Sequence, residues 1–161
     1  MRRVVWFGIV VLLAAVAVVA WNDSVRMQDR LVALYTQAFD SLVNWDQAKA
    51  AGLQYVAIDT TRLGGLDDDS VKEVLAFFRG KYGVETLSGS LQDLRDQGRA
   101  TEVGLINGIL FRVDKARFWL NRVATIEVSE YRGNLGAYGE TFAAWFLFGR
   151  WNLGTQGSWV S

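Results

Sequence analysis

The sequence contains no cysteine, no histidine and no proline among its 161 residues. Without cysteine the chain can form neither a disulfide nor a thiolate nucleophile, and it offers no attachment site for a lipoprotein lipid. Without histidine it lacks the usual zinc ligand and the usual general base. Without proline, its corners must be turned by its 16 glycines together with asparagine and aspartate. The composition thus excludes several common catalytic and structural devices.

The charges of the chain are balanced, because 17 Lys and Arg stand against 17 Asp and Glu. Leaving Arg2 and Arg3 out of the count leaves 15 basic and 17 acidic side chains, a net charge of −2. Such a balance gives no electrostatic footprint for nucleic acid. We therefore expect no nucleic-acid partner, and the residues suggest no cofactor.

An apolar run of 18 residues, from Val4 to Trp21, follows Arg2 and Arg3. About 20 apolar residues span a bilayer as a helix, and basic residues stay on the cytoplasmic side. Residues 1–21 are thus predicted to be a transmembrane anchor or uncleaved signal. The membrane would be a partner through residues 4–21, in a single-pass protein with a cytoplasmic N-terminus and an extracytoplasmic domain. The alternative is a secreted protein, because Ala15-Val16-Ala17 and Val18-Val19-Ala20 resemble signal-peptide cleavage sites.

Residues 22–51 are predicted to form a membrane-proximal amphipathic helix, because apolar residues recur three or four apart and Gly52 follows them. The apolar stripe, broadened by Tyr35 and Phe39, contains Met27, Leu31, Leu34, Ala38, Leu42 and Trp45. Two interpretations are open. The stripe packs on the chain's own domain, or it forms a coiled coil that makes a homodimer through Val25–Ala50.

Residues 52–161 predict a single extracytoplasmic α+β domain. A short strand and two shorter helices come first, and after Gly104 the apolar period changes from about 3.6 to 2. Strands are then expected over 105–112, 123–131 and 141–148, followed by the tight turn Gly149-Arg150 and a returning strand. The expected fold class is α+β: an N-terminal transmembrane or long helix, two shorter helices and a C-terminal antiparallel sheet of about four strands. Cystatin-like and NTF2-like domains are fold-level analogies.

The segment from Tyr131 to Gly139 is the leading candidate for binding. Its glycines at 133, 136 and 139 let the backbone approach a neighbouring group closely, and loops between strands often carry binding residues. We expect ligand or partner contacts from side chains that interfaces favour in this segment and on the last strand, namely Tyr131, Arg132, Asn134, Tyr138 and Trp159.

Acidic residues suggest two further hypotheses. Asp67-Asp68-Asp69 could bind a hard cation, but acids that open a helix also cap it, and the spacing of a calcium loop is absent. We therefore expect a cap and no metal site. Asp59 and Glu140 could be the paired carboxylates of a secreted hydrolase, although their spacing does not favour this. We assign no catalytic residue and favour binding over catalysis.

Three sets of residues carry a resemblance to a known family. They are Ala57-Ile58-Asp59-Thr60-Thr61; Lys81-Tyr82-Gly83-Val84-Glu85 with Leu91, Leu94 and Gly98; and Tyr131-Arg132-Gly133-Asn134-Leu135-Gly136-Ala137 with Trp159-Val160-Ser161. Over residues 31–161 the chain resembles an uncharacterised family of small exported or membrane-anchored proteins of Gram-positive bacteria, sometimes labelled peptide-transporter substrate-binding proteins. The resemblance implies one small extracytoplasmic domain and brings no catalytic residue.

Taken together, these features predict a membrane-anchored extracytoplasmic binding domain for an unknown protein or small ligand. The alternatives are a secreted carboxylate-dependent hydrolase and a structural homodimer through the Val25–Ala50 helix.

Overall fold

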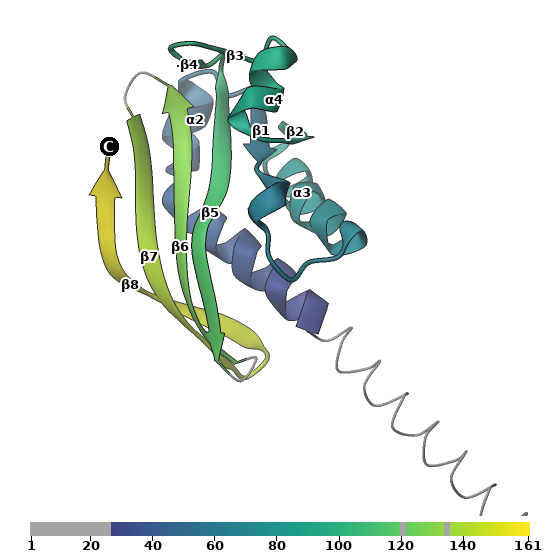
Figure 1. Ribbon diagram of the computed structural model, residues 1–161, viewed down its shortest axis with the longest axis vertical. Coiled ribbons are helices and arrows are strands. Elements are labelled where there is room, and N and C mark those ends of the chain that lie inside the picture. The colour runs from purple at the N-terminus through teal and green to yellow at the C-terminus, as the bar shows by residue number, and fades with distance from the viewer. Residues whose placement is uncertain (1–26, 120–121, 134–135) are drawn as a thin grey trace, which may run out of the picture.

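A six-stranded mixed sheet organises the computed structural model, which describes residues 27–119, 122–133 and 136–161 (Figure 1). The strand order is β2-β1-β5-β6-β7-β8. Strand β1 (Tyr55–Ile58) runs parallel to both β2 (Glu85–Ser88) and β5 (Gly108–Trp119). The long strands β5, β6 (Val123–Gly133), β7 (Gly136–Leu147) and β8 (Arg150–Val160) are antiparallel. A small second sheet pairs β3 (Ala100–Thr101) with β4 (Gly104–Leu105).

Helices lie on both faces of the large sheet, and successive strand residues alternate between those faces. On the first face, called the helix face, the main core joins sheet residues to a helix over residues 27–42, to α2 (Trp45–Ala50) and to α3 (Asp68–Tyr82). On the other face, called the outer face, α4 (Leu91–Asp96) packs Leu94 against Tyr55, Ala57 and Leu110. A 3₁₀ turn, η1 (Thr60–Arg62), follows β1. The outer face of β6, β7 and β8 is left largely open by this arrangement (Figure 1).

The apolar stripe of the 27–42 helix is buried in the chain's own core. Leu34, Tyr35, Ala38 and Phe39 are 0% exposed. The ring of Phe39 stacks on that of Phe111 in β5, with centroids 5.0 Å apart. The stripe is therefore not available to a second copy, and the structure supports packing on the chain's own domain.

The expected continuous helix over 25–50 is interrupted at Val43 and Asn44. The side-chain oxygen of Asn44 accepts a hydrogen bond from the backbone N–H of Gln47 at 3.2 Å, which caps the new helix α2. The ring of Trp45 stacks on that of Tyr82 at 3.7 Å, and its Nε1 donates to the carbonyl of Asp40. The break thus places α2 against α3.

The Asp67-Asp68-Asp69 segment acts as a helix start, as expected. The Asp67 carboxylate accepts a hydrogen bond from the backbone N–H of Ser70 at 2.8 Å and is the N-cap of α3. That hydrogen bond lowers the pKa of the Asp67 carboxyl. Within the described residues, no group of three or more Asp or Glu side chains is placed to hold a metal ion.

The turn between β7 and β8 differs from the expected Gly149-Arg150. Leu147 pairs with Arg150, so the two turn residues are Phe148 and Gly149. Both have left-handed backbone angles, with φ of 53° and 79°. This is the conformation of a type I′ turn, in which a phenylalanine at the first position is unusual.

The expected fold class is wrong in two respects. The sheet has six strands, two of them added by parallel pairing, where about four antiparallel strands were expected. Of the helices in the described residues, none is both long and apolar enough to cross a membrane, which contradicts the expected transmembrane or signal-anchor helix. Residues 1–21, on which that expectation was based, lie outside the described residues.

Candidate ligand-binding site

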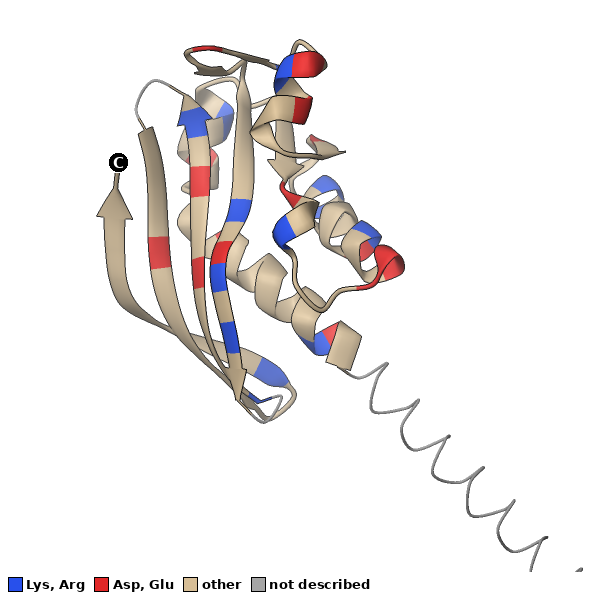
Figure 2. Ribbon diagram, in the orientation of Figure 1, with Lys and Arg blue, Asp and Glu red and all other residues tan. Residues whose placement is uncertain are grey.

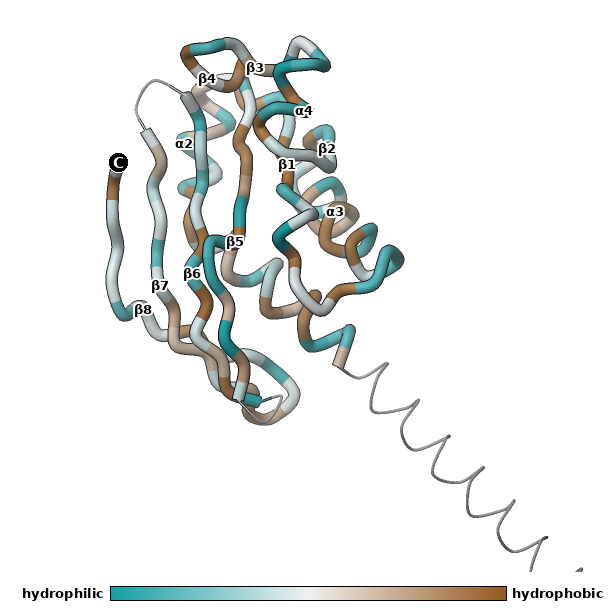
Figure 3. Tube along the Cα trace, in the orientation of Figure 1, coloured by the Kyte–Doolittle hydropathy of each residue, from teal (hydrophilic) through white to brown (hydrophobic). Residues whose placement is uncertain are grey.

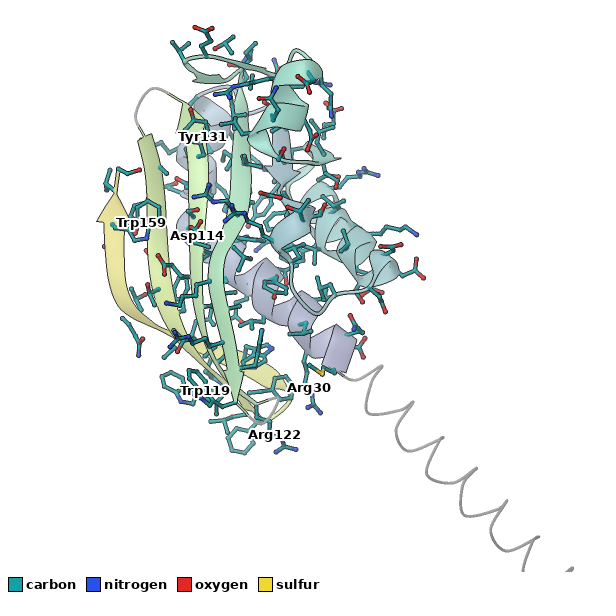
Figure 4. All side chains as sticks on the ribbon, viewed as in Figure 1. Arg30, Asp114, Trp119, Arg122, Tyr131 and Trp159 are labelled. Carbon is teal, nitrogen blue, oxygen red and sulfur yellow. The ribbon has the colours of Figure 1, made fainter. Side chains whose placement is uncertain are left out.

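The predicted binding residues do not form one surface. Arg132 and Tyr138 point to the helix face, where they line a cleft beside α2. Tyr131 packs on the outer face against the α4 cluster. Trp159 lies on the outer face of the edge strand β8, where its indole covers Gly139 of β7 (Figure 4). Asn134 lies outside the described residues.

The glycines of the 131–139 segment bring backbone and neighbouring groups close together, which confirms that expectation. A Cβ atom added to Gly104 would lie 2.0 Å from the Cα atom of Gly133. A Cβ atom added to Gly139 would lie 2.4 Å from the indole of Trp159. The first approach joins the small β3–β4 sheet to the end of β6.

The cleft on the helix face has a volume of about 520 Å³, which is within the range of small-molecule sites. Its walls come from the end of the 27–42 helix, from α2 and from β6, β7 and β8. They combine apolar side chains with a few polar groups: Leu42, Asn44, Gln47, Ala51, Glu130, Arg132, Gly136, Ala137, Tyr138 and Val160.

Arg132 is shared by the cleft and two neighbouring cavities. One, of about 230 Å³, lies toward α2 and the start of β5, and the other, of about 410 Å³, lies beside the β3–β4 sheet. The side chain of Arg132 is 37% exposed. Its Nε is buried and has no hydrogen-bond acceptor in the described part of the chain. Arg132 is therefore the charged side chain that the three cavities share.

Glu130 is the acidic partner of Arg132. Nη2 of Arg132 donates to Oε2 of Glu130 at 3.0 Å. Glu130 is 9% exposed, and its burial raises the pKa of the carboxyl above the ordinary 4.5, although the hydrogen bond and charge of Arg132 act in the opposite direction. A proton on Glu130 would leave the Arg132 charge without its counter-charge.

Tyr138 is held in place on the neighbouring strand. Its hydroxyl donates to the carboxylate of Glu140, which also accepts from the hydroxyl of Thr155 at 3.3 Å. The hydrogen bond to Glu140 raises the pKa of the Tyr138 hydroxyl. The cleft wall on β7 is therefore fixed by a short polar chain that reaches β8.

The structure does not bring Asp59 and Glu140 together. Asp59 follows β1 and is engaged by the Thr61 hydroxyl at 2.5 Å and by Arg62 at 3.6 Å. Glu140 is in β7, and strands β5 and β6 lie between β1 and β7. Three strand spacings separate the two residues by about 14 Å, beyond the separation at which two carboxylates flank a glycosidic bond. This pair therefore does not form the paired-carboxylate centre of the alternative hydrolase hypothesis.

Glu130 was missed as a site residue by the sequence analysis. It continues the register of Ile126 and Val128, both of which are buried on the helix face. An acid at a buried register position needs a partner. A charged residue at a buried register position therefore indicates Glu130 as a site residue. Arg132, two residues later on the same strand face, is its ion-pair partner.

Comparison with protein-family models, curated proteins and solved structures gives no match for this chain. The resemblance to the exported family stays a prediction.

Proposed function

We propose that this chain is a binding protein whose Arg132 cleft holds a small ligand with an oxyanion group and an apolar body. The observation that carries the proposal is the position of Arg132, which lines three adjoining cavities and whose buried Nε–H has no acceptor in the described residues. Guanidinium groups bind carboxylate and phosphate through paired, charge-assisted hydrogen bonds.

The other walls of the cleft fit the body of such a ligand. Leu42, Ala51, Ala137 and Val160 supply apolar surface. Asn44, Gln47 and Tyr138 add uncharged polar groups. A few polar groups on a mainly apolar wall orient a ligand without reacting with it.

Binding is favoured over hydrolysis by the acids around the cleft. Among the described residues of the cleft wall, Glu130 is the one acid, and it is already engaged by Arg132. The nearest acid on the next strand, Glu140, is held by Tyr138 and Thr155 and is not part of the wall. The described residues of the wall therefore lack the second carboxylate that acid–base hydrolysis of a glycoside requires.

Thermal unfolding with simple oxyanion probes tests this proposal. A ligand that binds the folded state raises the unfolding temperature by mass action. We expect benzoate or phenyl phosphate to raise it and the neutral benzamide not to do so. Arg132→Gln should abolish the shift. Arg117→Gln, which removes an exposed arginine from the outer face, is the matched control and should retain the shift. Equal shifts with benzoate and benzamide, or no shift with either oxyanion, would contradict the proposal.

A further inference from the structure

Five large apolar side chains are exposed at one end of the sheet, where the β5–β6 and β7–β8 hairpins turn. We call them the tip surface: Trp119 (48% exposed), Val123 (39%), Trp145 (44%), Leu147 (54%) and Phe148 (100%). Figure 3 shows hydrophobic segments at this end of the hairpins. A cluster of exposed apolar side chains on a small domain marks an interaction surface.

The tip surface is continuous across three strands. Trp119 pairs with Val123, and Val123 pairs with Trp145, so the three side chains form one cross-strand row on the outer face. Leu147 lies two residues beyond Trp145 on the same face of β7. Phe148 then extends the row to the turn.

Phe148 is presented to solvent by an unfavourable backbone conformation. It has φ of 53° and its side chain is completely exposed. The left-handed conformation is energetically unfavourable for any residue that has a Cβ atom. Asn or Gly is therefore usual at this turn position. In the described structure, no side-chain packing of Phe148 offsets the energy of this backbone conformation. Such a residue is typical of a site that contacts something outside the fold.

The charges within the two hairpin ends that form the tip surface are all positive. Between Ala116 and Thr125 and between Ala143 and Gly154, the charged residues in the sequence are Arg117, Arg122 and Arg150, with no Asp or Glu. All three arginines are exposed. Figure 2 shows basic and no acidic segments at this end of the sheet. The surface therefore combines aromatic rings with a positive rim.

The beginning of the 27–42 helix lies at the same end of the molecule. The guanidinium of Arg30 stands 4.9 Å from the ring centroid of Phe146, and Nε1 of Trp151 donates to the Arg30 carbonyl at 2.6 Å. Arg30, Trp119 and Arg122 are labelled at this end of the molecule in Figure 4. In the sequence, the apolar run 4–21 precedes this helix.

We propose that the tip surface docks on an anionic lipid bilayer, with Phe148, Trp119 and Trp145 in the interfacial region and Arg122 and Arg150 against the headgroups. Aromatic rings favour the water–lipid interface, and arginines near an anionic surface add attraction. A second copy of the chain is a poorer occupant, because apposed tips would place arginine against arginine.

A single cysteine introduced into this cysteine-free chain reports on the tip directly. The full-length Phe148→Cys variant, labelled with an environment-sensitive fluorophore, is titrated with vesicles of phosphatidylcholine and phosphatidylglycerol. We expect a blue shift, an increase in emission and quenching by lipid-borne nitroxides. The matched control is Val103→Cys, which labels an exposed apolar position, 62% exposed, at the β3–β4 end (Figure 1). Its emission should not change.

Arginine variants test the charge term. In the Phe148→Cys background, Arg122→Gln with Arg150→Gln should raise the half-maximal lipid concentration about 30-fold. Arg62→Gln with Arg95→Gln removes the same charge elsewhere and should not. The proposal is overturned if the chain binds vesicles while the label at 148 stays in water, or if it does not bind. It is equally overturned if the label shifts without lipid as the protein concentration rises, which would show that a second copy covers the tip.

Discussion

The indole of Trp159 occupies the space that a side chain at position 139 would need. The two residues are paired across β7 and β8, and a Cβ atom on Gly139 would lie 2.4 Å from Cε2 and 2.5 Å from Cζ2 of the indole. An aromatic ring over a cross-strand glycine is a known way to stabilise an edge of a sheet. Trp159 therefore belongs to the packing of the outer face, and the cleft does not include it.

Gly139→Ala should destabilise the fold by about 1–3 kcal/mol, because the added methyl displaces the indole. Gly157→Ala is the matched control, since it lies on the neighbouring strand with nothing within 4 Å of its added Cβ. We expect it to be neutral or to stabilise by less than about 1 kcal/mol. Urea denaturation of both variants measures the difference, and equal free energies of unfolding would refute this packing.

Phe148→Asn should stabilise the isolated domain. Asparagine accepts the left-handed φ of 53° found at this position, and Asn-Gly is the preferred sequence of a type I′ turn. Since the Phe148 ring is fully exposed, its removal loses no packing. We expect a gain of about 1 kcal/mol over Phe148→Ala, seen as a higher unfolding temperature. If alanine and asparagine gave the same temperature, backbone strain at the turn would be excluded.

Glu130 should make stability fall as the pH rises. Its carboxyl has a raised pKa in the folded state, so the folded protein holds the proton more tightly than the unfolded chain does. The resulting stabilisation is complete below the ordinary value of 4.5 and is lost as the pH rises through the folded-state pKa. Compared with Glu130→Gln, the wild-type chain should therefore lose stability in urea titrations as the pH rises above the ordinary value of 4.5 and through the raised folded-state pKa. A difference between the two proteins that is constant over this range would show that Glu130 is not perturbed.

Local patterns in the sequence predicted many elements of the fold. The spacing of Leu31, Leu34, Ala38 and Leu42 identified a helix with one buried side, and those residues are in the core. Ser90 is the N-cap of α4, one of the short helices of this domain, and forms a capping box with Asp93. Such features depend on residues a few positions apart, which a single sequence displays directly.

Features that depend on distant pairing could not be predicted in this way. The parallel alignment of β1 with β2 and β5 depends on segments that are about 30 and 50 residues apart in the chain. The helix break at Asn44 is followed by Trp45, whose ring stacks on that of Tyr82, a residue distant in the chain. Tyr131 and Arg132 are neighbours in the sequence, but strand alternation sends them to opposite faces of the sheet, so the 131–139 segment does not form one surface.

The most direct test of the binding proposal is a calorimetric titration of the full chain with phenyl phosphate, for the wild type, Arg132→Gln and Arg117→Gln. Loss of the charge-assisted hydrogen bonds of Arg132 should weaken binding about 10- to 100-fold. Arg117→Gln, on the outer face, should bind as the wild type does. If Arg132→Gln retained the wild-type affinity, or if both variants lost affinity equally, the Arg132 cleft would not be the ligand site.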